Sequence, residues 1–255
     1  KDNTPIPTLE LKNCVFPHTY KNYSALLNQT QTWIPCESSL KTVDEFTVNH
    51  WMERLYFERL EVKYSAIETQ LLDSNHNWEA VLFWQLAKNF GLKVNGDAFL
   101  SIAKSMAFSV VRKSQHSIHH LEALFFGQAG LLESEAQNAY ISELKNTYEF
   151  LKHKFSLSRE GVIPVHFFRL RPPNFPTIRL AQLAGVYSRR SNLFSSIIEA
   201  QSLEQLYAIF EGSTSSFWNT HYTFEKTSKS SSKTLTKAFM NLLIINTIVP
   251  IKIMS

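Results

Sequence analysis

The sequence predicts a mainly α protein, a multi-helix orthogonal bundle with one N-terminal β-strand left over from an upstream β-rich segment. Three observations lead to this fold class. Apolar residues recur at helical spacing through most of the 255 residues. Only 7 residues are glycine, and no Gly-rich phosphate-binding motif is present. A single alternating segment, IPTLELK, opens the chain and is typical of a strand.

The N-terminal strand has no evident partner in the sequence. A lone strand leaves its backbone donors and acceptors unpaired, and no second strand is convincing in the next hundred residues. We therefore expect the chain, which begins with Lys1, to be a fragment whose partner strands lie upstream. A short helix is expected after Pro17, followed by a connection that Pro35 interrupts.

A long helix is predicted from about Thr47 to Leu72. Asp44 and Glu45 precede it, and acidic residues suit the positive end of a helix dipole. Apolar residues recur along this segment at roughly helical spacing. They are Trp51, Leu55, Leu60, Ile67 and Leu71.

Capping residues mark several further helices. Asn77 predicts the N-terminus of WEAVLFWQLAKNF, and Gly91 its end. Asn95 is interpreted as the cap of GDAFLSIAKSM, and SVVRK as a short extended break. SIHHLEALFFGQAGLL returns to helical spacing. Ser134 with Gln137 forms a capping-box pattern that opens the next helix.

Residues 156–176 hold four of the nine prolines and predict an irregular connection. Pro176 suits the first position of the following helix. Three more helices are expected, at NLFSSIIEA, SLEQLYAIF and TLTKAFMNLLIIN. The apolar stretch LLIINTIVPIKI is shorter than the roughly 20 residues of a membrane span. It predicts a buried helix followed by an extended segment, so we expect no membrane association.

These elements suggest three segments along the chain. Residues 1–40 hold the strand and a connecting helix, residues 41–155 a helical subdomain, and residues 156–255 a second, basic helical subdomain. The two subdomains could equally form one continuous domain. With two cysteines and no apolar signal segment, we expect a cytoplasmic protein.

Charge is distributed unevenly. Residues 1–150 hold 13 basic and 17 acidic side chains, a net charge of −4, whereas residues 151–255 hold 13 and 5, a net charge of +8. A basic C-terminal part fits an anionic partner such as nucleic acid, or simply a soluble surface.

The segment HFFRLRPPNFPTIRLAQLA concentrates arginine around the Pro-rich entry to a helix. Guanidinium groups near free helix amides favour phosphate or carboxylate. The same arginines could instead tie an irregular loop to carbonyls of neighbouring helices. The interleaved aromatic residues could stack bases or fill the core. The residues predicted to bind an anion or nucleic acid are Arg169, Arg171, Arg179, Arg189, Arg190, His166, Lys233 and Lys237.

No catalytic residue and no cofactor is predicted. His116, His119 and His120 are weak metal candidates, because helical spacing places them on neighbouring faces. They lack an H-E-x-x-H motif or a nearby cysteine, and polar positions at the start of an amphipathic helix explain them equally well.

Four ordered blocks carry a family resemblance. With the preceding RLYFERLE helix, they resemble an uncharacterised bacterial family known as domain of unknown function 2851. The resemblance implies a longer protein with an upstream β-rich segment that looks like a metal-dependent nuclease core. The G-P-D-F and E-I-H elements of that segment are not in this chain, so no catalytic residue is carried over. The blocks are NWEAVLFWQLAKNFGLKVNGDAF, LEALFFGQAGLL, FFRLRPPNFPTIRLAQLA and FWNTHYTF.

The leading functional hypothesis is a helical accessory module that binds nucleic acid or another polyanion within a larger, nuclease-like protein. Its basic surface would come from residues 166–190 and 226–237. The alternative is a structural or protein-interaction scaffold that holds the upstream β-rich segment or another protein. An enzyme with a complete site in this chain is the third hypothesis, and the sequence leaves the oligomeric state open.

Overall fold

The computed structural model describes residues 8–11, 14–28, 34, 37–133, 138–212 and 214–255. It divides the chain into two compact units, Lys1–Arg59 and Leu60–Ser255. The predicted boundaries at residues 40 and 155 stay a prediction. Side chains from both sides of residue 155, such as Leu144 and Ile178, belong to one hydrophobic core.

The first unit contains α1 (Pro17–Leu27), α2 (Glu37–Leu40) and the first half of α3 (Glu45–Asp73). The predicted helices after Pro17 and around residues 47–72 are confirmed. The N-terminal strand is not seen, because residues 8–11, its described part, form no strand. The β-pairing in the described chain is one isolated bridge, His221 to Thr227. Alternation alone does not make a strand when no second strand accepts its hydrogen bonds.

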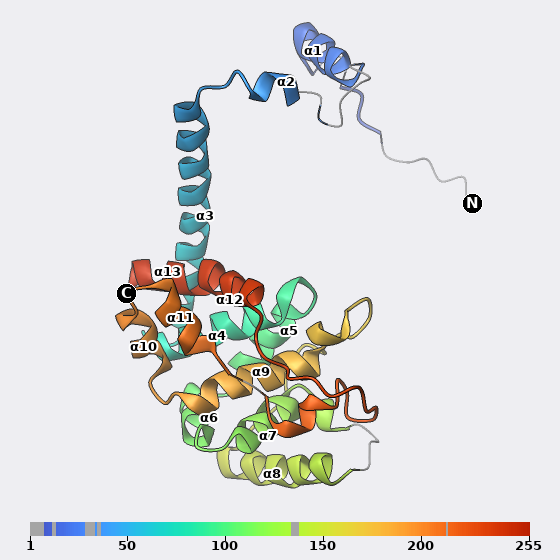
Figure 1. Ribbon diagram of the computed structural model, residues 1–255, viewed down its shortest axis with the longest axis vertical. Helices are drawn as coiled ribbons and strands as arrows, with labels where there is room; N and C mark the ends of the chain where they lie inside the picture. The colour runs from blue at the N-terminus through green and yellow to red at the C-terminus, as the bar shows by residue number, and fades with distance from the viewer. Residues whose placement is uncertain (1–7, 12–13, 29–33, 35–36, 134–137, 213) are drawn as a thin grey trace, which may run out of the picture. The chain divides into compact units, whose positions relative to one another are not determined.

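The second unit contains the second half of α3 and the helices that follow it (Figure 1). Short 3₁₀ turns lie at Leu131–Glu133, Pro172–Asn174 and Ser216–Asn219. The α-helices are α4 (Trp78–Phe90), α5 (Leu92–Lys104), α6 (Phe108–Ser114), α7 (Ile118–Gln128), α8 (Ala139–Phe155), α9 (Pro176–Arg189), α10 (Leu193–Glu199), α11 (Leu203–Phe210), α12 (Lys237–Leu243) and α13 (Val249–Met254).

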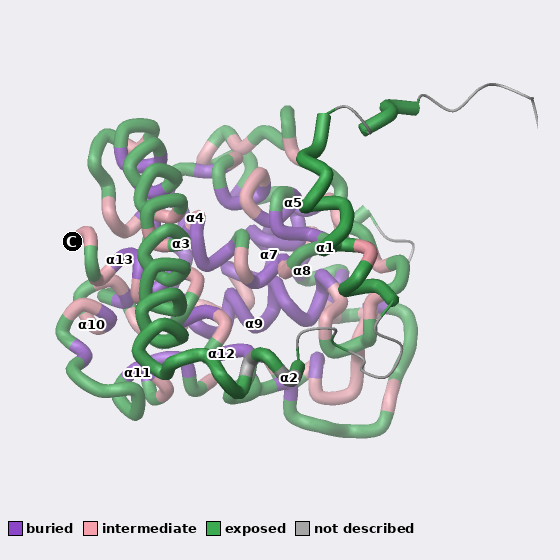
Figure 2. Tube along the Cα trace, turned by 90° about the horizontal axis from the view of Figure 1, so that it is seen from above, coloured by how far each residue is buried: buried purple, intermediate pink, exposed green. Residues whose placement is uncertain are grey.

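The core of this unit is centred on α4, α7 and α9, where buried residues are concentrated (Figure 2). α7 packs between α8 and α9, and α4 packs against α5 and α9. The close approach of α7 and α8 requires glycine at position 127, because a Cβ there would overlap the ring of Tyr148. The fold is therefore mainly helical, as predicted, while the orthogonal arrangement stays a prediction.

Local capping follows the sequence at the start of α4. The Asn77 side chain accepts a hydrogen bond from the Ala80 amide at 3.1 Å, as an N-cap should. Two local predictions are wrong. Asn95 lies inside α5, not at its start, and SVVRK belongs to helix α6, not to an extended break. Tertiary contacts decided both, since Asn95 and Val111 are buried in the packed unit.

The predicted capping box at Ser134 and Gln137 lies outside the described residues. The following helix, α8, is capped by Asn138, whose side chain accepts from the Ile141 amide at 2.9 Å. Pro176 is the first residue of α9, as predicted, and the segment before it is irregular.

The C-terminal segment remains helical to Met254. After α12, a π-helical turn at Ile244–Ile248 leads into α13, so the predicted extended ending is wrong. Pro250 is tolerated because it lies in the first turn of α13, where its missing N–H is not needed. By length and composition, Lys237–Met254 could cross a membrane. Here it packs against α4 and buries Leu243, Ile248 and Ile251 in the core.

Candidate functional site

Two of the predicted anion-binding residues, Arg179 and Lys233, are buried. Arg179, in α9, is buried, with 8% of its surface exposed. Its guanidinium donates to Gln182 Oε1 at 2.9 Å and to Asn174 Oδ1 at 2.6 Å, and it lies 3.7 Å from the ring centre of Phe239. Burial lowers the pKa of Arg179 to about 10. The arginine thus ties the irregular segment before α9 to the start of α9 and to α12.

Most of the other predicted basic residues also contact the protein itself. Arg189 donates to the Glu211 carbonyl at 3.3 Å, and Arg190 donates to the Ala208 carbonyl at 3.2 Å. Lys233 is buried and donates to Ser231, while its ammonium lies 4.1 Å from the ring centre of Tyr222. Lys237 lies over the ring of Tyr207 at 5.0 Å. Much of the positive charge in residues 151–255 therefore stabilises loops and helix ends.

His166, Arg169 and Arg171 remain exposed in the segment before α9. Phe168 is 77% exposed, and the Arg169 guanidinium lies 5.1 Å from its ring centre. The backbone of Arg169 has a φ of 61°, which is uncommon for a residue other than glycine. Strained backbone of this kind is found preferentially at functional sites. The segment thus presents an aromatic ring and two guanidinium groups to solvent.

The same segment is held in place by polar side chains of α5. Asn95 is 2% exposed, and its amide forms two hydrogen bonds with the backbone of His166, at 2.7 and 2.8 Å. The Ser101 hydroxyl accepts from the Ile163 amide at 2.9 Å. The segment is therefore irregular but anchored, and sequence reasoning, which assigned Asn95 to a helix cap, missed this role.

A pocket of about 400 Å³ lies beside this segment. Phenyl rings dominate its walls, and a carboxylate lies at its edge. The lining residues are Leu131, Phe167, Phe175, Thr177, Thr223, Phe224 and Glu225.

The most unusual titratable group is Glu122, which is fully buried in α7. Its carboxylate accepts from the Tyr140 hydroxyl at 2.5 Å and from the Trp218 indole at 3.1 Å, and Tyr140 is also 3.0 Å from the Ser215 hydroxyl. Burial raises the pKa of Glu122 to about 7, although these hydrogen bonds oppose the shift.

Glu122 joins three elements through one buried carboxylate: α7, α8 and the turn at Ser216–Asn219. Its partners are phenol, indole and hydroxyl groups, so the arrangement can hold or release a proton near neutral pH. It does not contain the carboxylate–histidine pair that would favour an enzyme. A single signal in the sequence pointed to it, since Glu122 is the one charged residue in LEALFFGQAGLL.

The three histidines do not form a metal centre with other ligands. His116 donates from Nδ1 to the Lys113 carbonyl at 3.0 Å when that nitrogen carries the proton, and its ring packs on His120 at 4.9 Å. His119 packs against the ring of Tyr140. Burial, followed by the neighbouring His116 and His119, lowers the pKa of His120. Among the described residues, no three His, Cys, Asp or Glu side chains are placed to share a metal ion.

An apolar surface lies on the part of α3 that belongs to the first unit, between residues 46 and 57. All the apolar side chains of this surface are exposed, and Phe46 is 75% exposed. We call this set the α3 apolar surface. Its members are Phe46, Val48, Trp51, Met52, Leu55, Tyr56 and Phe57.

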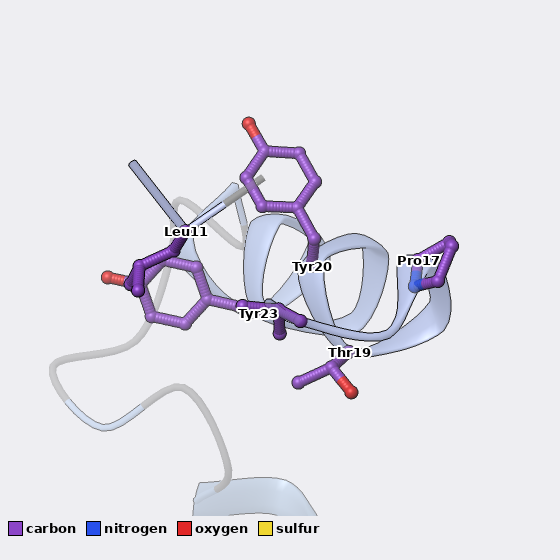
Figure 3. Close-up of a pocket in the computed structure, with 6 residues that line it drawn as sticks. Leu11, Pro17, Thr19, Tyr20 and Tyr23 are labelled. Carbon is purple, nitrogen blue, oxygen red and sulfur yellow. The ribbon is translucent and has the colours of Figure 1, made fainter. Parts of the chain in front are cut away.

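The α1 helix adds a second apolar area in the first unit. It buries none of its residues, and its lining side chains surround a concavity of about 820 Å³ (Figure 3). Leu11, Tyr20 and Tyr23 line this concavity and are themselves exposed. Because exposed side chains form its walls, it is a shallow apolar surface and not a closed ligand site.

The whole chain, residues 1–255, matches the model of a family described as Protein of unknown function (DUF2851). This match confirms the resemblance that the four sequence blocks indicated. No curated protein and no solved structure matches the chain. The match therefore assigns the chain to a family but does not supply an activity.

Proposed function

This chain belongs to the DUF2851 family, and we propose that it is a helical scaffold that holds a β-rich protein segment of the kind the family resemblance implies. The observation that carries the proposal is the α3 apolar surface, which is exposed on two opposite sides of one helix. Exposed apolar side chains that cluster on one element favour a site of interaction with another protein segment.

The geometry of α3 explains why the occupant is a folded segment. An α-helix turns once per about 3.6 residues, so residues nine apart lie on opposite sides. Ile67 and Leu71 are buried in the core of the second unit, and Leu60 is partly buried. Within the first unit, Phe46 and Leu55 are nine residues apart, so they lie on opposite sides of the helix, and both are exposed. A partner that packs along one side only cannot cover both, so the occupant is a larger segment.

The basic residues support the scaffold over a polyanion-binding surface. Arg179 and Lys233 are buried, and Arg189 and Arg190 donate to backbone carbonyls. Basic groups that bond within the protein stabilise the helical unit. They contribute less to the electrostatic field outside the protein.

Site-specific photo-crosslinking of the protein expressed from its natural gene tests the scaffold. A photoreactive amino acid replaces Trp51, and mass spectrometry identifies the crosslinked peptide. Phe150 is the matched control, because it is an exposed aromatic residue on α8, outside the α3 apolar surface. We expect position 51, and not position 150, to crosslink to a β-rich segment. Crosslinks to α3 of a second copy would show that this surface is a dimer interface instead. If position 51 forms no crosslink at all, the scaffold proposal is wrong.

Nucleic-acid binding is a second candidate function, which the exposed pair of Phe168 and Arg169 favours. An aromatic ring stacked with a guanidinium is a suitable platform for an unpaired base. A salt titration of binding to single- and double-stranded DNA and RNA tests it. We expect single strands to bind more tightly and affinity to fall with salt. Phe150→Ala is the control for Phe168→Ala, since Lys154 lies over the Phe150 ring in a similar pair.

If no nucleic acid binds at low salt, or if Phe168→Ala binds as the unchanged chain does, this second function is wrong.

A further inference from the structure

We infer that residues 214–221 form a pH-sensitive latch, which is held against α7 and α8 while Glu122 carries a proton and is released when Glu122 loses it. A buried chain of hydrogen bonds, from Glu122 through Tyr140 to Ser215, carries this inference. The inference goes beyond the scaffold, because these bonds lie in the second unit and the α3 apolar surface lies in the first. Failure of one proposal therefore leaves the other standing.

Hydrogen bonds hold the latch to the two helices at the Glu122 carboxylate. The Trp218 indole of the latch donates to Glu122 Oε1 at 3.1 Å, and the Tyr140 hydroxyl of α8 donates to Glu122 Oε2 at 2.5 Å. The Ser215 hydroxyl of the latch lies 3.0 Å from the Tyr140 hydroxyl. Three backbone amides of the latch bond to carbonyls within it, so these amides do not attach it to either helix.

Aromatic rings pack around the same carboxylate. Phe217 stacks on Tyr140 at 4.0 Å, and His221 stacks on Phe217 at 3.9 Å. The Trp218 ring is fully buried and packs 5.4 Å from Phe126 of α7. A buried indole needs an acceptor for its N–H, and the carboxylate of α7 supplies it. The contact between the latch and the helices is therefore built around one titratable group.

The chain of hydrogen bonds can be satisfied in both protonation states. A hydroxyl group donates one hydrogen bond and also accepts. When Glu122 is protonated, it can donate to Tyr140, which then donates to Ser215. When Glu122 is ionised, Ser215 donates to Tyr140, which donates to the carboxylate. The two states differ in charge, because the ionised state places a full negative charge in the interior.

The surroundings of Glu122 do not neutralise this charge. Burial raises the pKa of Glu122 to about 7, and the groups that oppose the shift are the uncharged donors of Tyr140, Ser215 and Trp218. His119 of α7 packs 6.1 Å from the Tyr140 ring. Titratable groups on the other elements around α7 have contacts elsewhere: Arg112 with Glu79, Lys113 with Phe155, Glu133 with Arg159, Tyr148 with Gln128, Arg179 with Asn174 and Gln182, and Tyr187 with Phe83.

Release of the latch gives the carboxylate access to water. There its pKa returns toward 4.5, so the released state binds the proton more weakly than the held state. The opening equilibrium therefore shifts toward release as the pH rises from 4.5 to about 7, and it levels off above that range. Between pH 6 and pH 8 we expect the opening constant to rise about ten-fold.

Native-state amide hydrogen exchange of the full chain at pH 6, 7 and 8 tests the latch, with rates corrected for the intrinsic pH dependence of exchange. Low urea concentrations separate local opening from global unfolding, because only global unfolding responds strongly to urea. We expect protection in residues 214–221 to fall about ten-fold between pH 6 and pH 8 and to be insensitive to urea. Protection in α9 is expected to be higher and to fall with urea.

Glu122→Gln keeps the shape of the side chain and should abolish the pH dependence in the latch. Tyr140→Phe removes a donor to the ionised carboxylate and should move the transition to higher pH, so the test survives if Glu122→Gln does not fold. His119→Gln and His221→Gln are the controls and should keep the wild-type transition. The latch is overturned if the pH dependence persists in Glu122→Gln, if Tyr140→Phe leaves the transition unmoved, or if either histidine variant abolishes it. Equal protection and urea dependence in residues 214–221 and α9 would also overturn it.

Discussion

At the scale of single residues, buried charge is the feature that most distinguishes this protein. Glu122 and Arg179 are both buried, and each hydrogen-bonds to uncharged groups. An ionised group without a charged partner is costly in the interior, so its protonation equilibrium shifts toward the neutral form. These two residues therefore offer direct tests of the structure.

Glu122 predicts a stability that falls with rising pH. Its pKa is about 7 in the folded chain, above the value of 4.5 for an exposed glutamate, so the folded state binds the proton more tightly. The free energy of unfolding should therefore be highest below pH 4.5 and fall as the pH rises to about 7. Glu122→Gln should remove up to about 3 kcal/mol of this dependence.

Urea denaturation of both chains at pH 5, 6, 7 and 8 measures this effect. The difference between the two chains isolates Glu122 from histidines that titrate in the same range. Parallel pH profiles would show that Glu122 does not titrate there.

Arg179 predicts a large loss of stability on truncation. Arg179→Ala removes two hydrogen bonds and the contact with Phe239, and leaves the acceptors of Asn174 and Gln182 without this donor. We expect the free energy of unfolding to fall by about 2–4 kcal/mol. Arg171→Ala, at an exposed site, should change it by less than about 0.5 kcal/mol. Thermal denaturation of the two variants checks this. Equal unfolding temperatures would contradict the internal role of Arg179.

At the scale of elements, the sequence and the structure agree where capping is local and differ where packing decides. Asn77 and Asn138 cap α4 and α8 through their own neighbours. Asn95 has the same residue type, yet it lies within α5 and binds a segment 71 residues away. Its partner is set by how α5 and that segment pack.

The role of Asn95 predicts a local effect as well as a global one. Asn95→Ala should remove both hydrogen bonds to His166 and lower stability by about 1–3 kcal/mol. Amide hydrogen exchange in residues 163–171 should become faster, while exchange rates in α7 should stay unchanged. Asn77→Ala is the matched control, since it should lower stability by about 1 kcal/mol without loosening that segment. Unchanged exchange at residues 163–171 would show that Asn95 does not anchor them.

At the scale of the whole molecule, the two units differ sharply in burial. None of the described residues between Thr8 and Arg59 is buried, whereas Leu60–Ser255 encloses a continuous hydrophobic core. Stability within a chain follows the number of buried apolar contacts, so the two units should open independently.

Limited proteolysis measures this difference. Cleavage should occur first before residue 60 and leave a resistant fragment close to 60–255. An occupant on the α3 apolar surface should slow that cleavage. Early cleavage within α7 or α9 would contradict the unit boundary.

The sequence by itself determined the mainly helical class, the DUF2851 relationship and most helix ends, because periodicity, caps and prolines act over a few residues. It could not determine that Arg179 lies inside the protein or that, among the described residues, no cation lies beside the buried Glu122. Only the tertiary structure decided these points, since burial depends on which distant segments meet. For the same reason Phe167, Phe175 and Phe224 line one pocket that no spacing in the sequence predicts.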